Sequence, residues 1–576
     1  MAKFRFRFSP ILPRTPPFTI GDGLILLGIA TLLYIGARLA FNAPAVITGP
    51  DISLSPLVLP WYALLSIGRM AAAYFLSLLF SLFYGYAAAR NRTARIVLMP
   101  LLDVLQSVPI LSFLPIVLLS LTAIMPQSVA AEIASIVLIF TSQAWNMTFG
   151  FYQSMNTIPT ELREASAIFR FNPWIRFKTL ELPFAAIGLL WNSMMSWSGG
   201  WFFLMAAEIF HVGTRDFRLP GIGSYLQTAA NEGNLPAVLW GTGILVLIIV
   251  LLDQFVWRPL TAWTDKFKIE MAESEEPPSS WFFDLLSSSW LLKQVKAKVW
   301  YPFSEWLDTR LRNRFGNHIP TEDAPAEKGV PVSIWIMTGI FVLGLLYGGY
   351  RAAILLNTLP AAAWLKLGKG LAATFLRVTI SLVIALLWTI PVGVAIGTNR
   401  RLANILQPIV QVVAAIPATA LFPVLLLAVL HTPGGLNLAA VLLMLMGTQW
   451  YLLFNIIAGT TSIPQDLRYT TELLGLSTLD RWRTLILPAL FPYIITGAIT
   501  AAGGAWNASI VAEHVEFGGK THATTGIGAL IAQATGEGDY AFLLASTLVL
   551  VVAVVLVNRT FWLRLYRLAE ERYRME

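Results

Sequence analysis

The chain has 576 residues, of which 56% are hydrophobic and only 12% charged. A soluble globular protein is normally about one quarter charged, so this composition with long uncharged runs indicates many membrane spans. The net charge of +8 does not indicate nucleic-acid binding, because the basic residues are scattered through short loops between apolar runs. The absence of cysteine excludes disulfides, thiol catalysis and Cys-based metal sites.

Apolar segments long enough to cross a bilayer, about 20 residues each, occur in two groups of six. The first group comprises 22–41, 62–89, 99–123, 128–150, 184–206 and 237–257, and the second comprises 333–356, 370–397, 406–430, 436–457, 488–511 and 541–562. We therefore predict an all-α integral membrane protein with about 12 transmembrane helices in two halves.

Basic residues alternate between successive loops. The tail before the first span carries Lys3, Arg5, Arg7 and Arg14, the segment 41–60 carries no Lys or Arg, and the stretch after the last span is again rich in Arg. Because Lys and Arg accumulate in cytoplasmic loops, we predict that both termini are cytoplasmic and that the protein lies in the cell inner (plasma) membrane. The basic N-terminus lacks a following small-residue cleavage site, so we interpret it as a tail and not as a signal peptide.

A long polar linker at 259–332 joins the halves and contains a Trp-rich stretch from Trp281 to Trp306. Two interpretations stay open, an interfacial amphipathic helix or a tether between two identically oriented halves, and the tether is favoured. We divide the chain into a cytoplasmic tail, first span and external segment (1–61), domain 1 (62–258), the linker (259–332), the first span of the second half (333–369), domain 2 (370–563) and a basic cytoplasmic tail (564–576).

The second half repeats the first. At an offset of 308 residues Arg69 coincides with Arg377, and at an offset of 305 Glu208 coincides with Glu513. Further coincidences involve Pro and Trp, which are scarce in this chain and therefore informative. Equivalent spans have the same orientation, so we predict parallel halves related by an axis along the membrane normal, with a solute pathway between them.

Each half carries a polar loop between its fourth and fifth spans, at 158–183 and 463–488. Asn172-Pro173 and Leu476-Ser477 are typical helix-breaking positions, so each loop is predicted to form two short helices, the first capped by Thr160 in the first half. Pro at the start of the following span removes only a donor that would be unpaired in any case.

These loops resemble the "EAA" coupling motif of binding-protein-dependent ABC importer permeases: Glu-Ala-Ala, three residues, Gly, then a hydrophobic residue and Leu-Pro. The first loop has Glu164, Ala165, Ser166, then Arg170 at the Gly position, then Leu182 and Pro183; the second has Tyr469, Thr470, Thr471, then Gly475, then Leu487 and Pro488. The first loop lacks the Gly and the second lacks the Glu-Ala-Ala. The resemblance implies a type I ABC importer-like fold with two sites, not necessarily equivalent, for two copies of a cytoplasmic ATPase.

Other features resemble the nitrate/sulfonate/taurine/bicarbonate branch of that family. Each half has Pro-x5-Pro in its third span (Pro109 and Pro417 begin the pairs), Ala-Glu at the end of its fifth span (Glu208, Glu513), and Gly-Ile-Gly after it (Gly221 and Gly223, Gly526 and Gly528). This resemblance implies a small, anionic solute delivered by a periplasmic or surface solute-binding protein.

The sequence indicates no energy source within the chain. An ion-coupled carrier normally has carboxylates or His inside its spans, and few are found here. The nearest match to a Walker loop is Gly519-Lys520-Thr521, but His514 stands where the earlier Gly is required. We therefore predict no catalytic residue, cofactor or metal site in this chain, with ATP and Mg bound by the separate ATPase. An ion-coupled secondary carrier and a non-transporting membrane scaffold are the alternatives.

Polar and aromatic residues inside the spans are candidates for the pathway: Gln106, Ser107, Pro109, Gln143, Trp145, Asn146, Trp201, Gln411, Pro417, Gln449, Trp450 and Trp506. They line a polar route or serve as hydrogen-bonding contacts between helices, and both readings stay open. For Glu208 and Glu513, anchoring of the external Gly-Ile-Gly segment is favoured over contact with a binding protein.

Overall fold

The computed structural model describes residues 20–41, 43–44, 48–212, 215–267, 280–315, 332–429, 432–461, 463, 465–517 and 520–572. The helices and strands of the first half are α1 (Ile20–Ala40), the 3-10 turn η1 (Pro56–Val58), α2 (Leu59–Arg90), α3 (Arg92–Ser107), α4 (Ile110–Thr122), α5 (Gln127–Asn156), α6 (Thr160–Ile168), α7 (Pro173–Arg176), the π turn η2 (Phe177–Glu181), α8 (Leu182–Glu208), β1 (His211–Val212), β2 (Arg215–Asp216), α9 (Ile222–Asn231), α10 (Leu235–Leu252), the π turn η3 (Asp253–Trp257) and α11 (Arg258–Asp265).

The second half repeats these elements in the same order. They are α15 (Val332–Leu356), α16 (Ala361–Thr398), α17 (Arg400–Ala415), α18 (Ala418–Val429), α19 (Gly435–Thr461), α20 (Gln465–Leu473), α21 (Thr478–Arg481), the π turn η5 (Trp482–Ile486), α22 (Leu487–Ala512), β3 (His514–Phe517), β4 (Lys520–Ala523), α23 (Ile527–Glu537), α24 (Tyr540–Val557), the π turn η6 (Asn558–Trp562) and α25 (Leu563–Arg572). The prediction of an all-α membrane fold built as two copies is confirmed, with one two-stranded antiparallel ribbon added in each half.

Helices cover every predicted span. In the described part of the chain, eight helices are long and apolar enough to cross a membrane, or nine if the bent pair α3–α4 counts as one span. The predicted span at 99–123 is in fact two helices that meet at 95°. The span at 406–430 is likewise divided into α17 and α18. Val108 and Ile416 are extended because the following Pro disfavours a helical conformation in the residue before it.

Prolines also explain three of the π turns. Pro183, Pro259 and Pro488 each lie two residues after the end of a π turn, and η2, η3 and η5 run without a break into α8, α11 and α22. A proline inside an α-helix removes one hydrogen bond and collides with the carbonyl four residues earlier, and the wider π turn relieves that collision. Pro183 and Pro488 lie in the first turn of α8 and α22, as predicted, although each helix runs on from the preceding π turn without a break.

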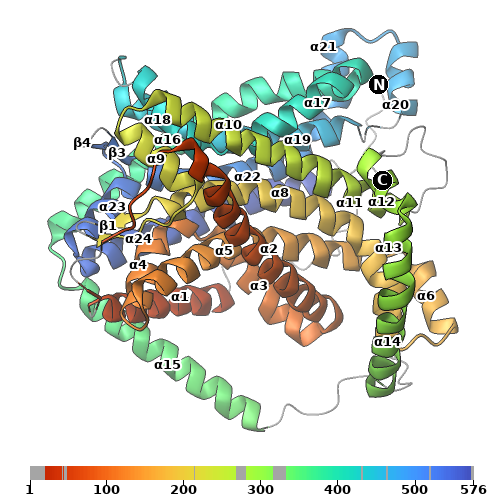
Figure 1. Ribbon diagram of the computed structural model, residues 1–576, viewed down its shortest axis with the longest axis horizontal. Helices are drawn as coiled ribbons and strands as arrows, with labels where there is room; N and C mark the ends of the chain where they lie inside the picture. The colour runs from red at the N-terminus through yellow and green to blue at the C-terminus, as the bar shows by residue number, and fades with distance from the viewer. Residues whose placement is uncertain are drawn as a thin grey trace.

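The long helices lie side by side and carry different structures at their two ends (Figure 1). One end, called the hairpin end, carries β1–β2, β3–β4, α9 and α23. The opposite end, called the loop end, carries α6–α7 and α20–α21. Small residues bring the helices close: a Cβ at Gly85 would lie 2.7 Å from the Phe151 ring, and one at Gly393 would lie 2.6 Å from Ile456. Such close backbone approach is how membrane helices associate without water to drive them together.

The halves join through their first helices and through the broken spans. Thr31 of α1 donates a hydrogen bond to the carbonyl of Leu345 in α15 over 3.0 Å. Thr547 of α24 donates to the carbonyl of Ser112 in α4 over 3.3 Å. Between the halves, the linker forms α12 (Trp281–Ser288), α13 (Trp290–Val295), the π turn η4 (Lys296–Trp300) and α14 (Tyr301–Phe315). These linker helices run across the loop end instead of continuing along the long helices (Figure 1).

Candidate functional site

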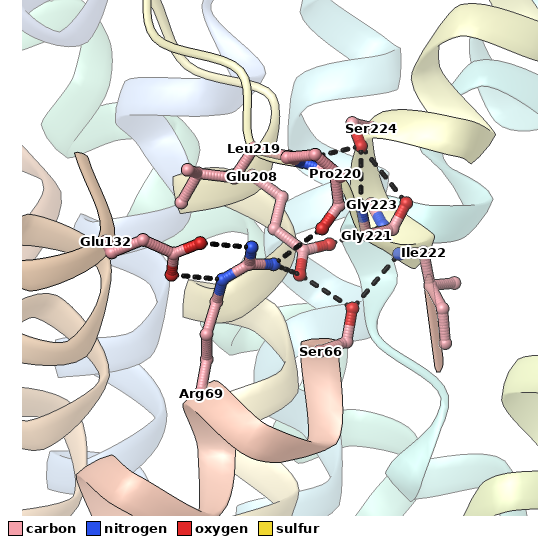
Figure 2. A network of polar contacts seen from close by, with 10 residues as sticks. All are labelled: Ser66, Arg69, Glu132, Glu208, Leu219, Pro220, Gly221, Ile222, Gly223 and Ser224. Carbon is pink, nitrogen blue, oxygen red and sulfur yellow. Dashed lines mark hydrogen bonds and ion pairs between the residues drawn. The ribbon is translucent and has the colours of Figure 1, made fainter. Parts of the chain in front are cut away.

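A buried carboxylate organises the hairpin end of the first half. Glu208, the last residue of α8, is completely buried. It accepts hydrogen bonds from the Ser66 hydroxyl at 2.6 Å, from Arg69 Nη1 at 2.8 Å and from the Gly223 N–H at 2.7 Å (Figure 2). Arg69 also donates to both oxygens of Glu132, over 2.7 Å from Nε and 2.6 Å from Nη2. The arginine thus joins α2, α5 and α8 in one polar network.

The glycines beside this carboxylate are required by space. A Cβ at Gly221 would overlap the Glu208 carboxylate, and one at Gly223 would lie 2.9 Å from its Oε2 atom. The Gly-Ile-Gly segment, which the sequence linked to Glu208, therefore packs its backbone directly against that side chain. The role of this contact in transport is not tested by the geometry and stays a prediction.

The second half repeats the network with Thr374 in place of Ser66 and Asn437 in place of Glu132. Glu513 accepts from the Thr374 hydroxyl at 2.7 Å, from Arg377 Nη1 at 2.7 Å and from the Gly528 N–H at 2.9 Å. A Cβ at Gly526 would overlap the Glu513 carboxylate. Arg377 also donates from Nη2 to the Oδ1 atom of the neutral Asn437 over 2.7 Å, to the Thr524 hydroxyl over 3.0 Å and to the Thr525 carbonyl over 2.7 Å. The sequence comparison matched the two arginines but assigned them no role, although an Arg in a span is costly and signals a paired site.

A cavity of about 600 Å³ opens between the halves. It lies among α8 and α10 of the first half, the α17–α18 break, α19 and α22. Of the predicted pathway residues it brings together Trp201, Pro417 and Trp450. Lining residues that the sequence did not single out include Trp191, Trp197, Phe202, Trp257, Tyr451 and Asn507. They were missed because they face each other only after the two halves pack.

The other pathway candidates do not line this cavity. Trp145 packs edge-on against Phe80, Gln449 accepts from Trp388 Nε1 at 3.1 Å, and Asn146 donates to the Ser196 hydroxyl over 3.2 Å. Trp506 is buried, Gln106 is exposed, and the side chains of Ser107 and Gln411 lie outside the described part of the chain.

Gln143 is completely buried, and neither amide atom has a hydrogen-bond partner among the described residues. A buried amide without partners destabilises the fold. The assignment of Gln143 and the other outlying residues to a pathway stays a prediction.

The two breaks in the third spans differ in the residue that reaches them from the other half. Pro109 occupies the N-cap position of α4, and Asn507 from the second half accepts from the free N–H groups of Ile110 at 2.5 Å and Leu111 at 3.4 Å. The first N–H groups of any helix lack partners within that helix, so Asn507 satisfies two of them. The position equivalent to Asn507 in the first half is Phe202, which faces the cavity beside Pro417.

The loops at the loop end share one internal geometry. Arg163 reaches from α6 back to α5 and donates to the Met155 carbonyl over 3.0 Å, and Arg468 donates to the Thr460 carbonyl at the equivalent place. Ser166 donates to the Arg163 carbonyl over 2.7 Å, and Thr471 donates to the Arg468 carbonyl over 2.7 Å. Both arginines were missed by the sequence analysis, although the offset of 305 residues pairs them. One expectation is wrong: Pro159 takes the N-cap position of α6, so Thr160 is its first helical residue and does not cap it.

The Gly position of the motif is left-handed in both loops. Gly475 has φ +62° and Arg170 has φ +52°, the one positive φ of a non-glycine residue in the described part of the chain. Glycine adopts this region freely, whereas a side chain is strained there. Arg170 therefore keeps the backbone turn of the motif at a cost in stability.

The loops present apolar side chains outward. At the end of α6, Ile168 and Phe169 are 78% and 73% exposed, and at the equivalent positions Leu473 and Leu474 are 89% and 68% exposed. Of the predicted coupling residues, Glu164, Tyr469 and Thr470 are also exposed, Ala165 is half-buried, and Ser166 and Thr471 are buried. An exposed apolar pair at the same place in both copies is typical of a contact surface.

The base of each loop is held differently. In the first half the buried Glu181 lies between Arg90 and Arg176, with Arg176 Nε at 3.0 Å. In the second half Ile486 replaces this carboxylate and Thr398 stands in place of Arg90. Leu182–Pro183 and Leu487–Pro488 follow directly, so each short helix is joined rigidly to its span.

The linker contacts the first loop through α14. Lys178 of η2 pairs with Asp308 at 2.5 Å and donates to the Ser304 hydroxyl over 2.9 Å, and Trp174 Nε1 donates to Asp308 over 2.8 Å. Partial burial acts to raise the pKa of Asp308, but the hydrogen bonds from Lys178 and Trp174 outweigh it, so this pKa is lowered overall. In the second loop, Leu479 replaces Trp174 and Arg483 replaces Lys178.

A family model described as "Binding-protein-dependent transport system inner membrane component" matches residues 77–256 and 389–575. The chain belongs to this family. The two matches cover both loops and all the cavity-lining helices, and they leave out α1, α15 and the helices of the linker. The protein is accordingly a multi-pass membrane component of a transport system, with the family domain present twice.

Individual relatives agree with the family. A nitrate import permease protein of Leptolyngbya laminosa is 32% identical over 169 residues, which is 29% of this chain and 57% of the relative. A bicarbonate transport system permease protein of Synechococcus elongatus is 34% identical over 156 residues, 26% of this chain and 55% of the relative. A taurine transport system permease protein of Escherichia coli is 29% identical over 191 residues, 33% of this chain and 64% of the relative. The chain thus spans somewhat more than half the length of the relatives that it matches.

Proposed function

We propose that this chain is the permease of an ATP-binding-cassette importer, in which both halves bind a separate cytoplasmic ATPase through α6 and α20. The loop end is then cytoplasmic, the hairpin end faces a periplasmic or surface solute-binding protein, and ATP and Mg are bound by two copies of the ATPase. The solute passes through the cavity between the halves.

One observation carries this proposal: the same exposed apolar tip occurs in both loops, on helices tied to the spans by the same arginine. Ile168 and Leu473 occupy equivalent positions, and Arg163 and Arg468 fix the helices behind them. Exposed apolar side chains favour a protein partner. The unbroken helix from each loop into its span supports transmission of a movement of that partner to the cavity.

The cavity supports a small polar solute. Its aromatic walls come from both halves, and Ser198, Tyr451 and Asn507 supply polar groups among them. A mainly apolar pocket with a few polar groups is typical of small-molecule sites. Two of the relatives are named for the anions nitrate and bicarbonate, which supports an anionic solute for this chain.

Site-specific cross-linking tests the ATPase contact. Because the chain has no cysteine, Ile168→Cys and Leu473→Cys each introduce a single reactive group. We expect both variants to cross-link to the ATPase in membranes that contain the whole complex. Leu57→Cys is the matched control, because Leu57 is as exposed as Leu473, at 89%, but lies in η1, at the start of α2 and far along the chain from either loop.

The same preparation distinguishes the alternative. ATP-driven uptake in proteoliposomes should require the ATPase. Uptake by the chain alone under a proton or sodium gradient would instead establish an ion-coupled secondary carrier and contradict the proposal.

A further inference from the structure

The linker carries an exposed aromatic face on η4 and α14. Trp300, Phe303 and Trp306, here called the aromatic strip, are 60%, 50% and 53% exposed. Their rings follow one another, with centroids 6.4 Å apart from Trp300 to Phe303 and 6.0 Å apart from Phe303 to Trp306. The Arg310 guanidinium lies 5.3 Å above the Trp306 ring and extends the strip with a positive charge.

One face of the same helix is fixed to the protein. Ser304 and Asp308, one turn apart, both bind Lys178, and Asp308 also binds Trp174. Residues one turn apart share a helix face, so these contacts set the rotation of α14. Trp300 lies one turn before Ser304 and begins the strip beside this face. Phe303 and Trp306 lie off the pinned face, and both side chains are exposed.

Positive charges accompany the strip. Lys293, Lys296 and Lys298 precede it and are exposed, as is Arg310. Of the acidic side chains of α14, Glu305 is exposed, whereas Asp308 is neutralised by its pair with Lys178. Exposed aromatic rings flanked by lysines and arginines are the composition that binds the interface of an anionic membrane.

The position of the linker favours the membrane over the ATPase. The linker helices cross the ends of the long helices, and α6 extends beyond them, farther from the bundle (Figure 1). A soluble partner that reaches the exposed tips of the loops meets α6 first. The linker instead lies at the level where the spans end, which is where lipid headgroups are found.

We propose that the aromatic strip and its neighbouring lysines bind anionic phospholipid headgroups, so that the linker is a membrane-surface strap pinned to the first loop through Asp308 and Lys178. The linker is then more than a tether. It fixes one of the two loops to the membrane surface, while the second loop has no equivalent contact among the described residues. This inference depends on the membrane location of the chain and not on ATP coupling.

The depth of single spin labels tests the strap. Phe303→Cys and Trp306→Cys place labels on the strip, and Glu305→Cys and Thr309→Cys place matched labels on an exposed polar side of the same helix. The full chain is reconstituted in nanodiscs of phosphatidylcholine alone or of equal parts phosphatidylcholine and phosphatidylglycerol. We expect the ratio of accessibility to oxygen over a water-soluble nickel chelate to be at least threefold higher at positions 303 and 306 than at 305 and 309. The difference should be larger with phosphatidylglycerol.

The lysines are tested in the same background. Lys296→Gln combined with Lys298→Gln should remove the dependence on phosphatidylglycerol and leave the elution volume of the protein unchanged. Equal access of the nickel chelate to all four labels in both lipids would overturn the proposal. Protection of positions 303 and 306 only after addition of the ATPase would overturn it too, because the strip would then bind that partner. Failure of the Ile168 and Leu473 cross-links would not affect these measurements, so the two proposals fail separately.

Discussion

The two halves place the same loop at the end of the same helices but stabilise it differently. In the first half a buried carboxylate, Glu181, lies between two arginines, and the linker docks alongside through Lys178. In the second half Ile486 fills the place of Glu181 and packs into an apolar cluster. The helices, the left-handed turn and the exposed tips are nevertheless the same. The geometry of the loop is therefore maintained by backbone features, whereas the side chains beneath it are exchangeable.

At the hairpin end, in contrast, the buried side chains are those that the two halves share. There both halves keep Glu, Arg, a hydroxyl and a close glycine, whereas the outer partner changes from Glu132 to Asn437. Glu208 and Glu513 are fully buried, while Glu132 is 41% exposed. A buried charge that loses its partner is far more costly than an exposed one, so the buried members are those that both halves retain.

The largest effect should come from the buried arginines. Arg69→Met leaves Glu208 buried without its charge partner and should lower the free energy of unfolding by about 3–5 kcal/mol. Arg377→Met should cost about the same or slightly less, because its outer partner is neutral. Unfolding in mixed detergent–SDS titrations measures both. Arg258→Met, which breaks the more exposed pair with Asp253, is the matched control and should cost under about 1 kcal/mol. Equal losses in all three variants would contradict the comparison.

A substitution at Gln143 tests whether this residue has a structural role or lines the solute pathway. Gln143→Met keeps the volume and removes two buried amide atoms that have no partner in the described part of the chain, so it should raise the free energy of unfolding by about 1–3 kcal/mol. The equivalent Thr448 already donates to the Met444 carbonyl over 2.7 Å, so Thr448→Val should be neutral or destabilising. A large loss of uptake with Gln143→Met, without a change in stability, would instead assign Gln143 to the pathway.

Charge reversal in the loops tests whether they are equivalent. Glu164→Lys with Ala165→Asp should reduce ATP-driven uptake by about tenfold, which corresponds to about 1.4 kcal/mol of coupling free energy. The matched change in the second loop, Tyr469→Lys with Thr470→Asp, should have a smaller effect, because that loop lacks the acidic start of the motif. Unchanged ATPase binding and uptake with the first pair would refute the docking assignment.

The left-handed turn gives a reciprocal pair of substitutions. Gly475→Ala introduces a side chain at φ +62° with open space around it, so strain alone should lower the free energy of unfolding by about 1 kcal/mol. Arg170→Gly relieves the same strain and should raise it by up to about 1 kcal/mol. If both substitutions were destabilising to the same extent, side-chain contacts of Arg170 would outweigh the backbone strain at this position.

The smallest effect concerns the linker. Because the pKa of Asp308 is lowered in the folded protein, its contribution is complete above its ordinary pKa of 3.8 and is lost as the pH falls through the lowered value. A spin label at Thr309 should therefore gain mobility only on strong acidification, below about pH 4. Asp308→Asn should show raised mobility already at neutral pH. A gain in mobility of the label that began between pH 5 and pH 7 would show that a group other than Asp308 titrates.

Much of the first loop could be predicted from sequence. The division into two short helices at Asn172-Pro173 follows from local residue types, which act over one or two turns. The match of Arg170 to the glycine position came from the resemblance to the EAA motif. The cap of α6 was mistaken, because Pro159 fits the N-cap position directly and shifts the start of the helix by one residue. Most of the pathway candidates lie outside the cavity. They were selected by polarity, and polarity alone does not distinguish a residue that lines a pathway from one that forms a contact between helices.

By itself, the sequence determined the spans, the two-fold repeat, the paired loops and the prolines that divide the third spans. These depend on composition and on fixed backbone preferences, which are local. Only the tertiary structure decided that Asn507 caps a helix of the other half, that Trp191 and Tyr451 share a cavity, and that Asp308 of the linker pins the first loop. Each of these contacts joins residues more than 100 positions apart, and which faces meet at that separation is set by the packing of whole helices.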